Sequence, residues 1–154
     1  MLSAGIDPSQ LTAGALMHEL KIRERAFNFL PGRAVTEVDV YFILDAMRQL
    51  TGYSQAKLYA GMTGEPPPLS SVTDAMQWFF QNWLGRIYVG ASDLSAGLFL
   101  DDPGEILIVF GTRSFVDRAT PYPGWLARTR FVNAADDPEQ TGWPNKFWTQ
   151  HLGE

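Results

Sequence analysis

The sequence contains no cysteine and only two histidines, which removes several kinds of chemistry. Without cysteine there is no disulfide, no zinc–thiolate or iron–sulfur site and no thiol nucleophile. A Ser–His–acid triad would need His18 or His151, and no Gly-x-Ser-x-Gly elbow is present to supply its serine. His18-Glu19 resembles half of a helical zinc motif but lacks a histidine four residues on. Glycine-rich phosphate-binding loops are also missing. The motifs therefore favour a binding protein over an enzyme.

Charge is scarce, and what there is leans acidic. Charged residues make up 19% of the chain and the net charge is −5. Affinity for a phosphate backbone comes from clustered Lys and Arg, so we expect no nucleic-acid partner. The acid excess lies in residues 65–154, which hold 11 acidic and 6 basic side chains. Such acids often occupy solvated turns, but they can also steer a basic partner.

Long apolar runs are absent as well. No stretch reaches the length of about 18 residues that a membrane span requires. The first residues have neither the basic start nor the sustained apolar stretch of a signal peptide. We therefore expect no membrane association and a cytoplasmic location, which also fits the lack of cysteine.

The clearest structural pattern is the apolar run at 104–112, which glycines bound at 104 and 111. Ile106, Ile108 and Phe110 would face one side of a strand, and Leu107 and Val109 the other. Because both faces are apolar, this segment predicts a central strand that is covered on both sides.

Helical patterns dominate the chain before residue 85. Apolar spacing and start signals predict helices over about 7–30, 36–50, 54–62 and 71–84. Thr36 begins the second of these, with Glu37 and Asp39 in its first turn. The three prolines at 66–68 predict a stiff extended loop, with a docking segment for an aromatic groove as the alternative.

Strand patterns follow. We predict strands over about 87–89, 98–100, 106–110 and 125–132, with a Pro-Gly turn at 103–104 joining the second to the third as a hairpin. The tail, 133–154, holds Trp143, Phe147 and Trp148, and we expect it to fold back on the domain with a short helix over 145–151. The prediction is one α+β domain, in which about four N-terminal helices (7–84) pack on a small C-terminal antiparallel sheet of about four strands (86–132), followed by the aromatic tail.

The function that we predict is binding to another protein, as a small acidic inhibitor. Bacterial toxin-immunity proteins and phage-encoded inhibitors share this general profile. Aromatic anchors among acids suit an interface with a basic target. The predicted partner-binding residues are Asp101, Asp102, Tyr122, Trp125, Asp136, Asp137 and Trp143.

Two alternatives stay open. The first is a small-molecule-binding or enzymatic domain with a pocket around Arg113, lined by Tyr88, Asp117 and Arg128. The second is a phage or secretion-system assembly component, which would self-associate. The aspartate pairs at 101–102 and 136–137 offer oxygen ligands, but without a third ligand at useful spacing they favour turns. We therefore expect neither a metal nor a cofactor.

Overall fold

A five-stranded antiparallel sheet with the strand order β1-β5-β4-β3-β2 forms the centre of the protein in the computed structural model. The structure describes residues 7–31, 35–50, 56–60, 71–82, 85–91, 93–100, 106–134 and 143–152. The strands are β1 (Ala26–Pro31), β2 (Ala56–Ala60), β3 (Ile87–Ala91), β4 (Ala96–Leu100) and β5 (Ile106–Gly111).

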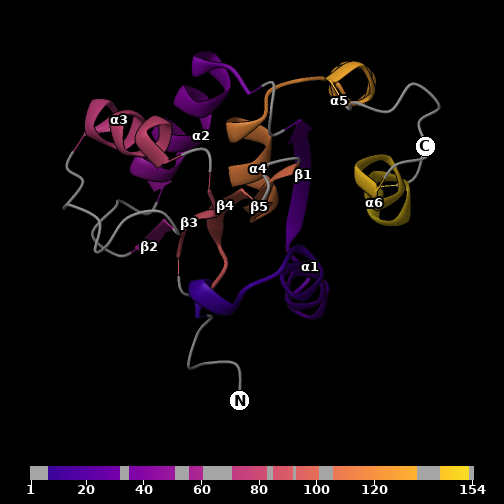
Figure 1. The fold of residues 1–154 in the computed structure, drawn as a ribbon, viewed down its shortest axis with the longest axis horizontal. Coiled ribbons are helices and arrows are strands. Elements are labelled where there is room, and N and C mark those ends of the chain that lie inside the picture. Colours follow the sequence, from indigo (N-terminus) through magenta and orange to yellow (C-terminus); the bar gives the residue numbers. More distant parts are fainter. Residues whose placement is uncertain are drawn as a thin grey trace.

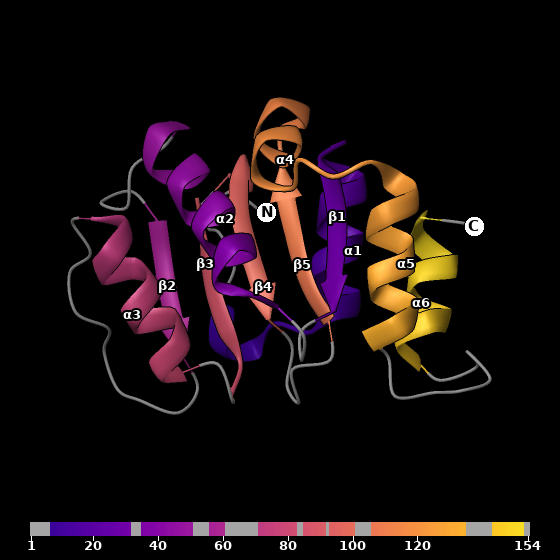
Figure 2. The ribbon, with the colours of Figure 1, turned by 90° about the horizontal axis from the view of Figure 1, so that it is seen from above.

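Helices cover both faces of this sheet (Figure 1). In Figure 2, α2, α3 and α4 lie in front of the strands and α1 lies behind them, while α5 and α6 stand beyond the β1 edge. The helices are η2 (Pro8–Gln10), α1 (Ala13–Ile22), α2 (Glu37–Leu50), α3 (Val72–Asn82), α4 (Arg113–Ala119), α5 (Gly124–Ala134) and α6 (Trp143–Leu152).

The prediction of a central strand at 106–110 is confirmed. β5 pairs with β1 on one side and β4 on the other, and all six of its residues are buried. Leu107 and Val109 belong to the apolar cluster under α2, α3 and α4. Ile106, Ile108 and Phe110 belong to the cluster under α1 and α6. The predicted hairpin is also confirmed, with Leu98 opposite Val109 in the β4–β5 register.

Glycine is required where β5 ends. Gly111 has a φ of +151°, and a Cβ there would lie 2.3 Å from the carbonyl oxygen of Ser95. The next residue, Thr112, donates its N–H to that same oxygen at 2.9 Å. Its hydroxyl then accepts from the N–H of Phe115 and so caps α4. The chain can therefore pass directly from β5 into α4.

The predicted division into N-terminal helices and a C-terminal sheet is wrong. The helix predicted over 7–30 is η2, α1 and the strand β1, since Glu24, with a φ of 54°, ends the helical path. The helix predicted over 54–62 is contradicted by residues 56–60, which form the strand β2. Both strands obtain their hydrogen bonds from distant segments, β1 from β5 and β2 from β3. Pairing with distant segments overrides a local helical pattern, because β preference depends strongly on context.

The strand predicted over 125–132 is also wrong, because these residues lie in α5. On a strand Arg128 and Arg130 would share a face, but on a helix they point about 200° apart. They reach different partners accordingly: Arg130 contacts Asp39 of α2 and Arg128 lies over the ring of Trp148 of α6. Along the chain, helices therefore lie before the first strand, between strands and after the last strand.

Some predictions fall outside the described residues. These are the polyproline segment at 66–68, the turn at 101–104, and the aspartates at 101, 102, 136 and 137. The predicted tail helix does lie within α6, and Trp148 is buried against the domain with 4% of its surface exposed. Among the described residues no helix is both long and apolar enough to cross a membrane.

Candidate functional site

The start of α2 carries a reciprocal pair of capping hydrogen bonds. The backbone N–H of Asp39 donates to Oγ1 of Thr36 at 3.1 Å, and the backbone N–H of Thr36 donates to Oδ2 of Asp39 at 2.9 Å. This is the capping-box arrangement, here with aspartate as its acid. It satisfies two backbone donors and fixes the Asp39 carboxylate at the first turn of the helix.

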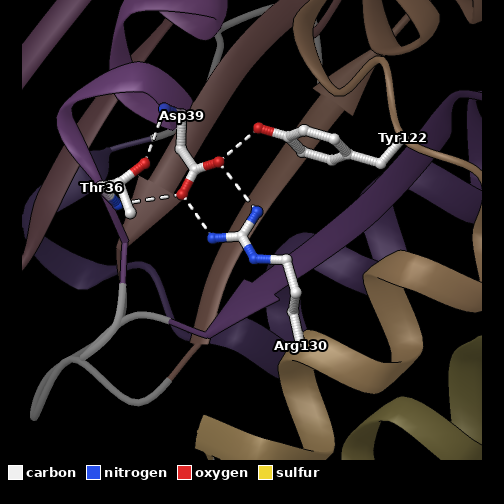
Figure 3. Close-up of polar contacts among 4 residues, drawn as sticks. All are labelled: Thr36, Asp39, Tyr122 and Arg130. Carbon is white, nitrogen blue, oxygen red and sulfur yellow. Dashed lines mark hydrogen bonds and ion pairs between the residues drawn. The ribbon is translucent and has the colours of Figure 1, made fainter.

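Two side chains from the α5 region converge on this carboxylate (Figure 3). Arg130 of α5 donates from Nη1 to Oδ1 at 2.9 Å and from Nη2 to Oδ2 at 2.6 Å. The hydroxyl of Tyr122, which precedes α5, donates to Oδ1 as well. The guanidinium also lies over the Tyr122 ring, 5.3 Å from its centroid. Asp39 therefore joins α2 to the segment that ends in α5.

The surroundings of Asp39 keep it ionised. Burial alone would raise the pKa of Asp39, but the hydrogen bonds from Arg130, the Thr36 backbone and Tyr122, together with the charge of Arg130, lower this pKa to about 2. Burial and the contact with Asp39 raise the pKa of Tyr122 to about 12. The hydrogen bonds to Asp39 likewise raise the pKa of Arg130 above its ordinary value.

These protonation states indicate a structural role. General acid–base catalysis works best with a pKa near the operating pH, and Asp39 and Tyr122 lie far from neutrality on either side. The carboxylate accepts four hydrogen bonds and is 2% exposed. We conclude that the Asp39 cluster (Thr36, Asp39, Tyr122 and Arg130) holds two elements together.

Beside this cluster, α2 presents apolar side chains to solvent. Val38 is 60% exposed, Tyr41 46% and Phe42 37%. Their spacing of i, i+3 and i+4 places them on one face of the helix. The rings of Tyr41 and Phe42 pack edge to face, with 6.1 Å between their centroids. Scattered apolar residues are normal on a surface, but three on one helical face form a patch.

The predicted partner-binding residues have separate positions in the structure. Trp125 lies in the first turn of α5 and is 70% exposed. Tyr122 is half-buried in the Asp39 cluster. Trp143 begins α6, and its side chain lies outside what the structure describes. The four aspartates at 101, 102, 136 and 137 also lie outside it.

The residues proposed for the ligand pocket do not all meet. Arg113 and Asp117 form an ion pair on α4 at 3.6 Å, with 71% and 66% of their side-chain surfaces exposed. Tyr88 is 1% exposed and packs against Phe99 and Phe110 in the cluster beneath α1 and α6, on the other face of the sheet from α4. Arg128 stacks over Trp148. The structure therefore brings two of the four together.

The sequence carries partial signals for the site residues that its motifs do not identify. Asp39 follows Thr36 at capping-box spacing, but its partners stand 83 and 91 positions away and no local pattern points to them. The α2 segment carries apolar residues over more than one face, and a stripe that is too wide for one buried side predicts exposed apolar surface. That width was the available signal for Val38, Tyr41 and Phe42.

Neither a search for metal-binding residues nor comparison with known proteins assigns a function to a site. Across the part of the chain that the structure describes, no three His, Cys, Asp or Glu side chains group together as a metal site would require. No protein-family model matches the chain, and comparisons with curated proteins and with solved structures give no significant match.

Proposed function

We propose that this protein binds another protein and inhibits it by covering part of its surface. The observation that carries the proposal is the exposed apolar face of α2, formed by Val38, Tyr41 and Phe42, which we call the α2 patch. Aromatic side chains are enriched at protein interfaces and often supply most of the binding energy. An enzyme is not proposed, because the Asp39 cluster is built to hold elements together.

A rigid surface binds with a smaller loss of conformational entropy than a mobile one. The Asp39 cluster supplies this rigidity, since its capping hydrogen bonds fix the helical turn that carries Val38. Its ion pair also joins α2 to α5, the helix that presents Trp125. We therefore include Trp125 in the proposed interface.

The partner that fits is a protein with an apolar depression surrounded by basic residues. This chain carries a net charge of −5, and Glu37 is exposed next to Val38. Opposite charge speeds encounter and orients the two surfaces. Inhibitors of bacterial toxins and phage-encoded inhibitors are the kinds of protein that this profile suggests. The lack of cysteine is compatible with action in the cytoplasm.

The test is retention of a stoichiometric partner from host lysate, followed by titration of the purified pair. Replacing Val38, Tyr41 and Phe42 together by serine should weaken binding at least about 30-fold, since loss of an interface anchor costs about 2 kcal/mol or more. The matched control is Ile22→Ser, which removes another exposed apolar side chain (53% exposed) from α1. Binding should also reduce the activity of the partner.

Three outcomes would contradict the proposal. One is equal affinity of the triple variant and the wild type for the purified partner. Another is a complex that leaves the activity of the partner unchanged. The third is a stable homo-oligomer that the serine variant dissociates, seen by light scattering, because this result would assign the α2 patch to self-association and favour an assembly component.

A further inference from the structure

A second polar contact joins elements on the opposite face of the sheet. Nζ of Lys21, in the last turn of α1, donates to Nδ1 of His151 in α6 at 2.8 Å. Lysine ammonium can only donate, so Nδ1 must be the unprotonated acceptor of a neutral imidazole. The contact exists only while the ring is neutral, because protonation would put two positive groups at this distance.

The rest of the α6 attachment is aromatic. Phe147 and Trp148 pack on Phe29 of β1, with ring centroids 5.1 Å and 5.8 Å away, and the His151 ring lies 4.6 Å from Phe147 and 6.3 Å from Phe29. A ten-residue helix is marginal in water on its own. The position of α6 therefore depends on the contacts that Phe147, Trp148 and His151 make with the rest of the domain.

Among the residues that the structure describes, the charged group that contacts His151 is Lys21, and its positive charge disfavours protonation of the ring. Lys21 approaches the ring from α1, and from α5 the guanidinium of Arg128 lies 5.2 Å from the ring centroid of the neighbouring Trp148. β1 contributes the uncharged ring of Phe29. We propose that the His151–Lys21 contact is a pH-sensitive clasp, which holds α6 on the sheet at neutral pH and releases it as acid protonates the ring.

The direction of the effect follows from linkage. Burial, and then the charge of Lys21, lower the pKa of His151 below its ordinary value. Docking of α6 on the sheet thus favours the neutral form of the His151 ring. Docking is fully favoured above the pKa of the undocked ring, about 6.5, and weakens as the pH falls through the lower pKa of the docked ring. Between these two pKa values, the equilibrium constant for docking of α6 falls by up to about tenfold for each unit by which the pH is lowered.

Amide hydrogen exchange of the α6 peptide tests the proposal with the protein alone. Protection, corrected for the intrinsic effect of pH on exchange, should fall between pH 7.5 and 5 in α6 but stay constant in β4 and β5. His151→Gln retains an acceptor for Lys21 but cannot be protonated, so α6 protection should become independent of pH. His18→Gln is the matched control, since His18 is exposed on α1, and should leave the pH dependence unchanged.

A second measurement does not depend on any variant. The His151 ring can be titrated by NMR in the wild-type protein, and its pKa should lie below the ordinary histidine value of about 6.5. Lys21→Met should raise the pKa of His151 and weaken the pH dependence of α6 protection. A His151 pKa at or above the ordinary histidine value of about 6.5 would overturn the proposal. So would α6 protection that is constant with pH in the wild type, or equally pH-dependent in His151→Gln.

Discussion

At the scale of single residues, the Asp39 carboxylate is the group on which α2 and α5 most depend. Asp39→Asn keeps the shape of the side chain but removes the charge that faces Arg130. We expect the free energy of unfolding to fall by about 2–3 kcal/mol, because hydrogen bonds to a charged group are lost and a partly buried guanidinium is left without its counter-charge. Urea denaturation at pH 7 measures this change.

The control is Asp45→Asn on the same helix. Asp45 pairs with Arg48 at 2.9 Å, but the Arg48 side chain is 47% exposed, and such pairs contribute little. A change within about 0.5 kcal/mol is expected. If both variants unfolded at the same urea concentration, the Asp39 cluster would not contribute measurably to stability.

Acid should reveal the same interaction. The pKa of Asp39 falls from 3.8 to about 2 on folding, so the ionised form is favoured in the native state. The stability that this shift provides is present above the unfolded pKa and is lost as the pH falls through the folded one. About 2 kcal/mol should therefore disappear between pH 4 and 2 in the wild type. Asp39→Asn should lack this component.

At the scale of elements, sequence reasoning succeeded where the determining contacts are local. β4 and β5 form a hairpin between adjacent segments, and α3 follows a serine start signal that its structure confirms, with the N–H of Asp74 donating to Ser71 Oγ at 3.1 Å. The local patterns of β1 and β2 predict helix instead, because the strands that pair with them lie far along the chain. In α5 the alternating pattern is compatible with a strand as well as a helix, and the structure has a helix over Gly124–Ala134.

Phe29 tests the revised assignment of β1. It is fully buried and packs against Phe27 within β1 and against Phe147 and Trp148 of α6. Phe29→Ala should reduce the free energy of unfolding by about 3–5 kcal/mol, the usual cost of a large cavity in a core. Trp125→Ala is the comparison, with a change within about 0.5 kcal/mol, because Trp125 is largely exposed. A loss below about 1 kcal/mol for Phe29→Ala would contradict the packing of β1 and α6 described here.

At the scale of the whole molecule, the sheet order explains what the sequence could not predict about the candidate site. β1, from the N-terminal part of the chain, pairs with β5, and the helices that follow each strand, α2 and α4, lie side by side (Figure 2). This arrangement brings Asp39 within reach of Tyr122 and Arg130. A single sequence shows each residue type but not the pairing of distant strands that makes them neighbours.

Net charge is also a property of the whole molecule. It yields the prediction that best separates electrostatic steering of the partner from the direct contacts of the α2 patch. If the partner is basic, the charge of −5 should speed association, and raising salt should slow it. Replacing the aspartates at 101, 102, 136 and 137 by lysine reverses the sign of the net charge. We expect the association rate constant to fall at least about tenfold at low salt and to approach the wild-type value at high salt.

The dissociation rate constant should change little with these charges. Charges at the rim of an interface act mainly on the association rate constant, whereas buried anchor residues act mainly on the dissociation rate constant. Surface plasmon resonance at several salt concentrations resolves the two rate constants. The serine variant of the α2 patch should dissociate faster but associate at nearly the wild-type rate. An association rate constant that neither salt nor the lysine substitutions change would remove electrostatic steering from the proposed function while leaving the α2 patch to be judged by its own dissociation rate.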